Sequence, residues 1–246
     1  VNARLERSVG QLDFFDFVSS VDVNLGDDQA GNGDIVPEQS WRAELGFERD
    51  YGTWGAGNVL VFAEALEDIV DQVPIGTGEG PGNLDTGSRV GIELEGTFKF
   101  DRIGWGGAQL EVNGGYYKSE VDDPLTGETR RITRDLIRSV ELELRHDIPD
   151  TNWAWGLHFE NEKNAGVYRL TNLRRFENVP GFAWGFVEHK DVFGMTASVF
   201  VANLFDQDDQ FTRAKYTPDR TGTIDSVEDH TRNFGPILTL RLKGTF

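Results

Sequence analysis

The strongest constraint on the fold is an alternation of apolar and polar side chains with a period of two residues. Around Ile92, for example, Arg89 and Glu93 alternate with apolar neighbours. Successive side chains of a β-strand point to opposite faces of its sheet, so each such segment has one apolar and one polar face. The same spacing occurs in residues 40–49, 107–117, 139–145, 152–160 and 238–246. The sequence therefore predicts an all-β fold.

Turn-forming residues divide the chain into about ten to twelve strands, with breaks at residues 50–52, 76–82, 147–150 and 180–181. Many of these strands have roughly 10 to 14 residues, longer than the 5 to 6 typical of soluble sheets. Residues 166–181 fit either a strand or a long loop. Residues 58–69 and 195–204 carry apolar side chains on both faces, so we expect them to face a covered region. The pattern predicts one antiparallel β-domain over residues 1–246.

Long strands with one apolar face favour a barrel that spans a membrane, because a tilted strand needs only about 9 to 11 residues to cross. Aromatic residues near the predicted strand ends match the interfacial belts of such barrels: Trp41, Trp54, Trp105, Tyr116 and Trp153. A soluble β-sandwich remains an alternative, since its strands alternate in the same way. An acidic, carbohydrate-binding sandwich of this kind would bury Trp41, Leu94, Trp155 and Leu240 in its core.

Composition excludes several functions. The formal net charge of −18 opposes binding to nucleic-acid phosphates, and the absence of cysteine excludes disulfides and cysteine-based metal or redox chemistry. No Gly-x-Ser-x-Gly, His-Glu-x-x-His or phosphate-binding glycine loop is found. His158 and Glu160 share a strand face, but a structural role is expected for both. We therefore expect no enzyme activity, no cofactor and no metal site.

Five segments together resemble the C-terminal half of the barrel of a TonB-dependent outer-membrane receptor. Residues 31–40 are similar to the family's GNPxLxPExS loop, and residues 44–48 and 91–95 resemble two of its strands. Residues 201–206, Val-Ala-Asn-Leu-Phe-Asp, match its penultimate-strand motif, and residues 235–246 resemble its closing strand. Their order and spacing extend over nearly the whole chain.

The resemblance implies a bacterial outer-membrane barrel of about 22 strands that encloses an N-terminal plug domain. It further implies active uptake of a bulky nutrient, such as a ferric siderophore, cobalamin or an oligosaccharide, with energy supplied through the TonB complex. The chain has room for about half of the strands and shows neither plug nor TonB box, so we expect a fragment of a longer receptor. In the alternative of a complete channel or adhesin barrel with about 10 to 12 strands, the strand near Asn2–Val9 would pair with the last one.

The alternation also predicts which residues face the barrel lumen, where they would mainly hold a plug through ion pairs and waters: Arg89, Glu93, Glu95, Lys99, Glu111, Glu141, Glu143, Arg145 and Arg241. Any direct substrate contacts are expected mainly from long loops. In the last strand, alternate apolar residues and a terminal phenylalanine resemble the signal read by the barrel-assembly machinery: Leu238, Leu240, Leu242 and Phe246. The opposite, apolar face of each strand is expected to contact lipid.

Overall fold

The protein is built from antiparallel β-strands, as its sequence predicts. The computed structural model describes residues 1–22 and 27–244, and these contain seventeen strands and three short 3-10 helices, η1 (Phe14–Phe17), η2 (Gly52–Trp54) and η3 (Asp101–Ile103). Fifteen strands form one sheet, and β2 (Ser20–Asp22) and β3 (Asp27–Gln29) form a separate hairpin. In the described ranges, no helix is long and apolar enough to cross a membrane.

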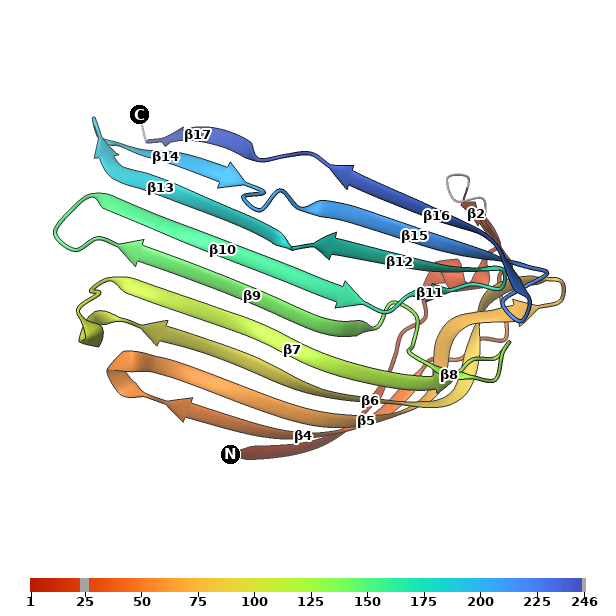
Figure 1. The fold of residues 1–246 in the computed structure, drawn as a ribbon. Helices are drawn as coiled ribbons and strands as arrows, with labels where there is room; N and C mark the ends of the chain where they lie inside the picture. Colours follow the sequence, from red (N-terminus) through yellow and green to blue (C-terminus); the bar gives the residue numbers. More distant parts are fainter. Residues whose placement is uncertain (23–26, 245–246) are drawn as a thin grey trace.

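Long strands lie side by side in the sheet (Figure 1). They are β1 (Asn2–Val9), β4 (Gln39–Asp50), β5 (Gly55–Ile75), β6 (Gly78–Lys99), β7 (Ala108–Asp122), β9 (Leu136–Asp147), β10 (Trp153–Asn164), β12 (Asn172–Val179), β13 (Phe182–Val192), β14 (Met195–Ala202), β15 (Asp208–Thr217), β16 (Thr223–Asn233) and β17 (Ile237–Lys243). Two short strands, β8 (Thr129–Arg130) and β11 (Val167–Tyr168), complete the sheet.

The two ends of the sheet differ in their connections (Figure 1). At the end that we call the turn end, short segments join the strands: residues 51–54, 100–107, 148–152 and 193–194. The opposite end, which we call the loop end, carries the two longest connections, residues 10–38 and 123–135, and also residues 76–77, 165–171 and 218–222. Residues 166–181, which by their sequence fit either a strand or a long loop, contain two strands, β11 and β12.

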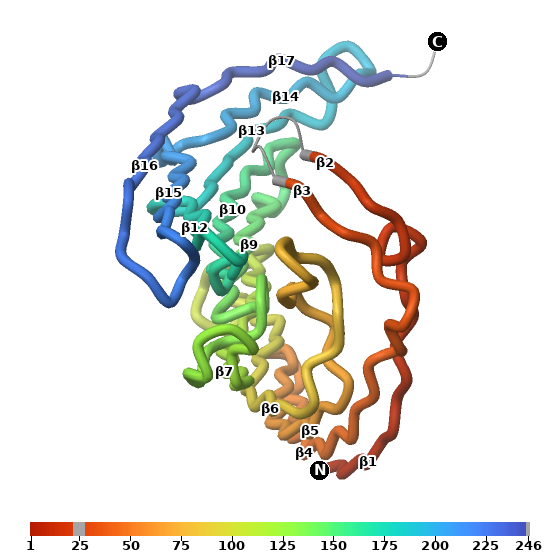
Figure 2. The backbone as a smooth tube through the Cα atoms, turned by 90° about the vertical axis from the view of Figure 1, so that its right-hand side faces the viewer, coloured from red at the N-terminus to blue at the C-terminus, as the bar shows by residue number. Residues whose placement is uncertain are grey.

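The sheet is strongly curved but not closed in the described part of the chain. β1, β4, β5, β6, β7, β9 and β10 follow one another, and beyond β10 the sheet divides. β12, β15 and β16 continue it toward the loop end, and β13, β14 and β17 toward the turn end. Among the residues that the structure describes, β1 pairs only with β4, β16 only with β15, and β17 only with β14. Viewed along the strands, the sheet forms an open arc, and the chain between β1 and β2 runs along its open side (Figure 2).

The division beyond β10 comes from three interruptions. Residues 180–181 separate β12 from β13, residues 203–207 separate β14 from β15, and residues 234–236 separate β16 from β17. Each of these pairs is one long strand that is interrupted once. Four of the seventeen strands, β2, β3, β8 and β11, have only two or three residues. Ten long strands remain, at the lower end of the predicted range.

The hairpin of β5 and β6 is longer than the sequence predicts. The pattern predicts a loop at residues 76–82, whereas β6 already begins at Gly78. Glycine is required here by close packing, since a Cβ at Gly80 would lie 2.3 Å from the carbonyl oxygen of Ala30. Gly76 forms the turn itself, whereas Gly80 marks the approach of another backbone.

A compact apolar core lies toward the loop end. Leu66 and Ile69 of β5 are almost fully buried and pack with Leu84, Val121 and Ile132. These neighbours come from β6, β7 and the connection before β9. The burial explains why β5 loses its alternation here and carries apolar side chains on both faces.

Candidate functional site

One face of the sheet carries all nine residues predicted to face a lumen. Directly paired residues of neighbouring strands share a face, and Glu111 of β7 is paired with both Thr97 of β6 and Glu143 of β9. The pairings through β10, β13 and β14 place Arg241 on that same face. The full set is Arg89, Glu93, Glu95, Lys99, Glu111, Glu141, Glu143, Arg145 and Arg241. We call this side of the sheet the polar face.

Ion pairs link strands across the polar face. Arg89 contacts Glu64 at 2.9 Å and Asp135 at 2.8 Å. Two further pairs skip an intervening strand: Arg42 of β4 with Glu93 of β6, and Arg145 of β9 with Glu188 of β13. Side chains converge on the concave side of a curved sheet, so we assign the polar face to the inside of the arc in Figure 2.

The opposite face is apolar and exposed. Phe47, Leu94 and Leu240 expose 44%, 47% and 75% of their surface, and Leu142 and Trp155 are partly buried. Phe47 and Leu94 flank Val59 in one cross-strand row, so the exposed side chains are continuous from strand to strand. No second sheet packs on this face in the described residues, contrary to what a sandwich requires. We call this surface the apolar band.

Aromatic residues mark the turn end of the apolar band. Trp54 lies in η2, Trp105 lies in the β6–β7 turn, and Trp153 begins β10. The indole N–H groups of Trp105 and Trp155 both donate to Nδ1 of His146, at 3.2 and 3.1 Å. Since Nδ1 accepts both bonds, the neutral ring carries its proton on Nε2, which lies 3.1 Å from the carbonyl oxygen of Gly106 and donates to it.

The other edge of the apolar band lies part-way along the strands. Tyr116 of β7 and Trp41 of β4 are exposed aromatic residues on the apolar face. Beyond Tyr116 the same face of β7 carries Lys118 and Glu120, which form an exposed ion pair. From Ala108 to Tyr116, β7 carries this apolar face over nine residues, within the roughly 9 to 11 that a tilted strand needs to cross a bilayer.

The last strand continues the apolar band. Leu238, Leu240 and Leu242 of β17 are paired with Val201, Val199 and Ala197, and all three leucines are highly exposed. The fourth residue of the predicted assembly signal, Phe246, lies outside the described residues.

The Val-Ala-Asn-Leu-Phe-Asp motif forms the interruption between β14 and β15. Asn203 is completely buried and has a φ of 53°. Its Oδ1 accepts a hydrogen bond from the backbone N–H of Gln207, and its Nδ2 donates to the carbonyl oxygen of Gly235. Asparagine tolerates this left-handed conformation better than most residues. Asn203 therefore joins two of the three strand interruptions.

Buried ion pairs join the connections at the loop end. Asp123, in the turn after β7, accepts hydrogen bonds from Arg130 at 2.6 Å and from Arg220 at 2.7 Å. Arg130 also contacts Asp71 of β5, and both guanidinium groups lie over the ring of Tyr168. Burial alone would raise the pKa of Asp123, but the hydrogen bonds from the Thr126 backbone N–H and the two arginines outweigh it and lower the pKa to about 2.

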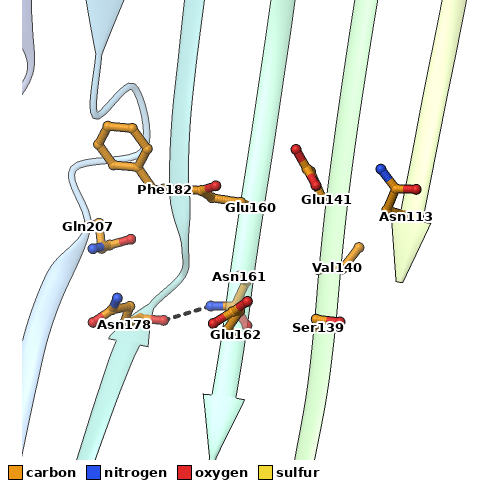
Figure 3. A pocket seen from close by; sticks show the side chains of 10 residues that line it. All are labelled: Asn113, Ser139, Val140, Glu141, Glu160, Asn161, Glu162, Asn178, Phe182 and Gln207. Atoms are coloured by element: carbon orange, nitrogen blue, oxygen red, sulfur yellow. Dashed lines mark hydrogen bonds between the residues drawn. The ribbon is translucent and has the colours of Figure 1, made fainter. Parts of the chain in front are cut away.

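A cavity of about 380 Å³ opens in the sheet where it divides (Figure 3). Most of its lining is polar: Asn113, Ser139, Val140, Glu141, Glu160, Asn161, Glu162, Asn178, Phe182 and Gln207. We call it the fork pocket. Asn161 is buried and donates from Nδ2 to the carbonyl oxygen of Asn178. The sequence pattern identifies only Glu141 of this set, because the division of the sheet that brings the others together depends on long-range pairing.

An aromatic group lies beside the fork pocket on the polar face. Trp184 stacks on His158 with ring centroids 4.9 Å apart, and it also contacts Phe186 and Phe200. His158 Nε2 lies 3.4 Å from a carboxylate oxygen of Glu160. In the part of the chain that the structure describes, no three His, Asp or Glu side chains are close enough together to hold a metal ion.

The described residues thus define an all-β protein with one curved antiparallel sheet, a polar concave face and an apolar convex face. No family model matches the chain, and no curated protein matches it either. The resemblance to TonB-dependent receptors therefore remains a prediction.

Proposed function

We propose that this chain is part of the barrel of a TonB-dependent transporter in the bacterial outer membrane. The observation that supports this most directly is the apolar band, which is exposed, runs across long strands and is bordered by aromatic residues at both edges. Water-soluble proteins rarely leave so large an apolar surface uncovered. Contact with lipid acyl chains would cover it.

On this proposal the open edges of the sheet belong to a larger barrel. Backbone groups in the bilayer core must be paired within the protein, because each unpaired group costs several kcal/mol. β1 and β17 each pair with one strand only, and they do not pair with each other in the described residues. Further strands at these edges would close the barrel. A complete small channel or adhesin barrel is less well supported, since it requires β1 to pair with the last strand.

The polar face would line the lumen. Its nine predicted residues mix acidic and basic groups, and several are held in ion pairs, as for Arg89 and Arg145. A plug domain would occupy this concave side, and the TonB complex would act on the plug. The transported nutrient would be a bulky small molecule such as a ferric siderophore, cobalamin or an oligosaccharide.

Single-cysteine labelling tests the proposal, because the native chain has no cysteine. Leu94→Cys lies on the apolar band, Glu93→Cys lies on the polar face, and Glu120→Cys lies on the apolar side beyond Tyr116. In phospholipid vesicles, a water-soluble maleimide should label the cysteines at 93 and 120 much faster than the one at 94. A lipid-borne quencher should quench only a fluorophore at position 94. Equal labelling at 93 and 94, with no lipid quenching, contradicts membrane insertion.

A further inference from the structure

The fork pocket collects negative charge that has no cation beside it. Glu141 of β9 and Glu160 of β10 are directly paired across neighbouring strands on the polar face. Like charges at such positions destabilise a sheet. Glu162 lies on the same face of β10 and also lines the pocket. No lysine or arginine is among the lining residues, although ion pairs link much of the remaining polar face.

Gln207 supplies an independent indication of a ligand. Only 5% of this residue is exposed, and its Nε2 donates to Asp209 at 3.0 Å. Its Oε1 is buried and accepts no hydrogen bond within the protein. A buried acceptor without a partner loses its hydrogen bonds to water and gains none in return. Figure 3 shows the Gln207 amide beside the pocket, with its oxygen on the side of Phe182 and Asn161.

The chemistry of the lining selects the class of ligand. Carboxylate, amide and hydroxyl oxygens can all accept hydrogen bonds, and Phe182 adds an aromatic ring, which attracts cations. A bare metal ion does not fit the arrangement, since in the described residues no three carboxylates or histidines converge on one point. A guanidinium group carries five N–H donors in one plane and a delocalised charge, which suits several separated acceptors.

We infer that the fork pocket binds a guanidinium group, with Glu141 and Glu160 as its charge partners and Gln207 Oε1 as a buried acceptor. The guanidinium belongs either to a small molecule that enters the lumen or to an arginine side chain of a polypeptide that covers the polar face. The inference rests on the proposed function in one respect: the ligand reaches the polar face through a water-filled lumen.

Calorimetric titration of the folded chain in detergent micelles with agmatine tests the site. We expect one binding site, with affinity reduced at least about tenfold in Glu141→Gln and in Glu160→Gln, because each loses a charged hydrogen bond. Gln207→Leu should weaken binding less. Glu143→Gln is the matched control, since it removes a carboxylate from the same face of the same strand outside the pocket, and its affinity should change less than about twofold.

Two further ligands sharpen the test. Cadaverine carries a second ammonium group where agmatine carries its guanidinium, so it should bind more weakly than agmatine. A Gly-Arg-Gly amide peptide distinguishes the sources: tighter binding of the peptide indicates a polypeptide arginine, and tighter binding of agmatine indicates a free ligand. The inference is overturned if neither agmatine nor the peptide binds. It is also overturned if Glu143→Gln and Glu141→Gln lose the same affinity for agmatine. Membrane insertion is measured separately by cysteine labelling, so the two proposals fail independently.

Discussion

The two halves of the β5–β6 hairpin place similar side chains in opposite surroundings. Toward the loop end, Leu66 and Leu84 are buried against other parts of the protein. Toward the turn end, Val61 and Ile92 are equally apolar but expose more than a third of their surface. The same two strands therefore pass from a conventional protein core to a surface that the described residues leave uncovered.

Ion-paired side chains are also buried at the loop end and accessible toward the turn end. At the loop end, Asp71, Asp123 and Arg130 are almost completely buried, and each has an ion-pair partner. On the turn-end side of the sheet, Arg145 and Asp147 pair on an accessible face. The comparison indicates that the loop end is stabilised by contacts within the protein. On the proposed function, lipid would cover the apolar face at the turn end. Substitutions in the two regions should therefore respond differently to the removal of lipid.

The largest effect is expected for Asp123→Ala. The change leaves Arg220 without its carboxylate and deprives Arg130 of one of two, so it should destabilise the loop end by about 3 to 5 kcal/mol. Hydrogen exchange of the loop-end backbone measures this, and the loss should be similar in vesicles and in detergent. Asp122→Ala, at an exposed neighbouring position, is the control and should have little effect. Unchanged exchange in Asp123→Ala would show that these ion pairs do not hold the loops.

A charge in the apolar band should have the next largest effect. Leu94→Arg lies near the middle of the band on β6 and should lower the free energy of unfolding in vesicles by about 2 to 4 kcal/mol. Ser88→Arg lies on the same strand and face but level with Trp41 at the edge of the band, where it pairs with Glu120, so it serves as the control. Urea titration of vesicle-bound protein gives both values. Equal effects at the two positions would contradict a lipid-facing band.

Acid should weaken the loop end before it affects the apolar band. The pKa of Asp123 is about 2 in the folded protein and 3.8 for the free side chain. A lowered pKa contributes stability that is fully present above about 4 and is lost as the pH falls toward 2, amounting to about 2 kcal/mol. The protection factors of the loop-end amides, which correct each exchange rate for the intrinsic rate at that pH, should fall over this range, and Asp123→Asn should remove that part of the pH dependence. A fall confined to the turn end would contradict this assignment.

The sequence pattern predicts a strand well where each face of the strand keeps the same kind of surroundings along its length. Alternation places all nine polar-face residues and the three leucines of β17 on their respective faces, because side-chain direction follows directly from strand geometry. The predicted turn at residues 76–82 is confirmed at residues 76–77 and wrong for residues 78–82, where Gly80 serves the close approach of Ala30 from a distant segment. Local turn propensity carries no information about such a contact.

The fork pocket could not be predicted, for a related reason. Its position depends on where β10 changes partner from β13 to β12, and that depends on the interruptions that shift the strands. Glu160 and Gln207 are far apart in the sequence, and each resembles an ordinary solvated residue there. The burial of Gln207 and the pairing of Glu160 with Glu141 become evident only in the folded sheet.

Loss of the Asn203 side chain should give the smallest of these effects. It also gives the most sensitive test of the comparison between the loop end and the turn end. Asn203→Ala leaves the Gln207 N–H and the Gly235 carbonyl without a partner, which should cost about 1 to 3 kcal/mol. Asn164→Ala is the control, since it removes an exposed asparagine at the end of β10, outside the interruptions, and it should cost less than about 0.5 kcal/mol.

Asn203 lies between the two regions, so its loss should loosen the division of the sheet without changing lipid contact. Urea unfolding in vesicles measures the stability, and agmatine titration reports whether the fork pocket keeps its shape, since Gln207 is held by Asn203. If Asn203→Ala leaves both unchanged, the motif does not position the interrupted strands. If it instead changes labelling at Leu94→Cys, the two regions are coupled more strongly than their separate contacts indicate.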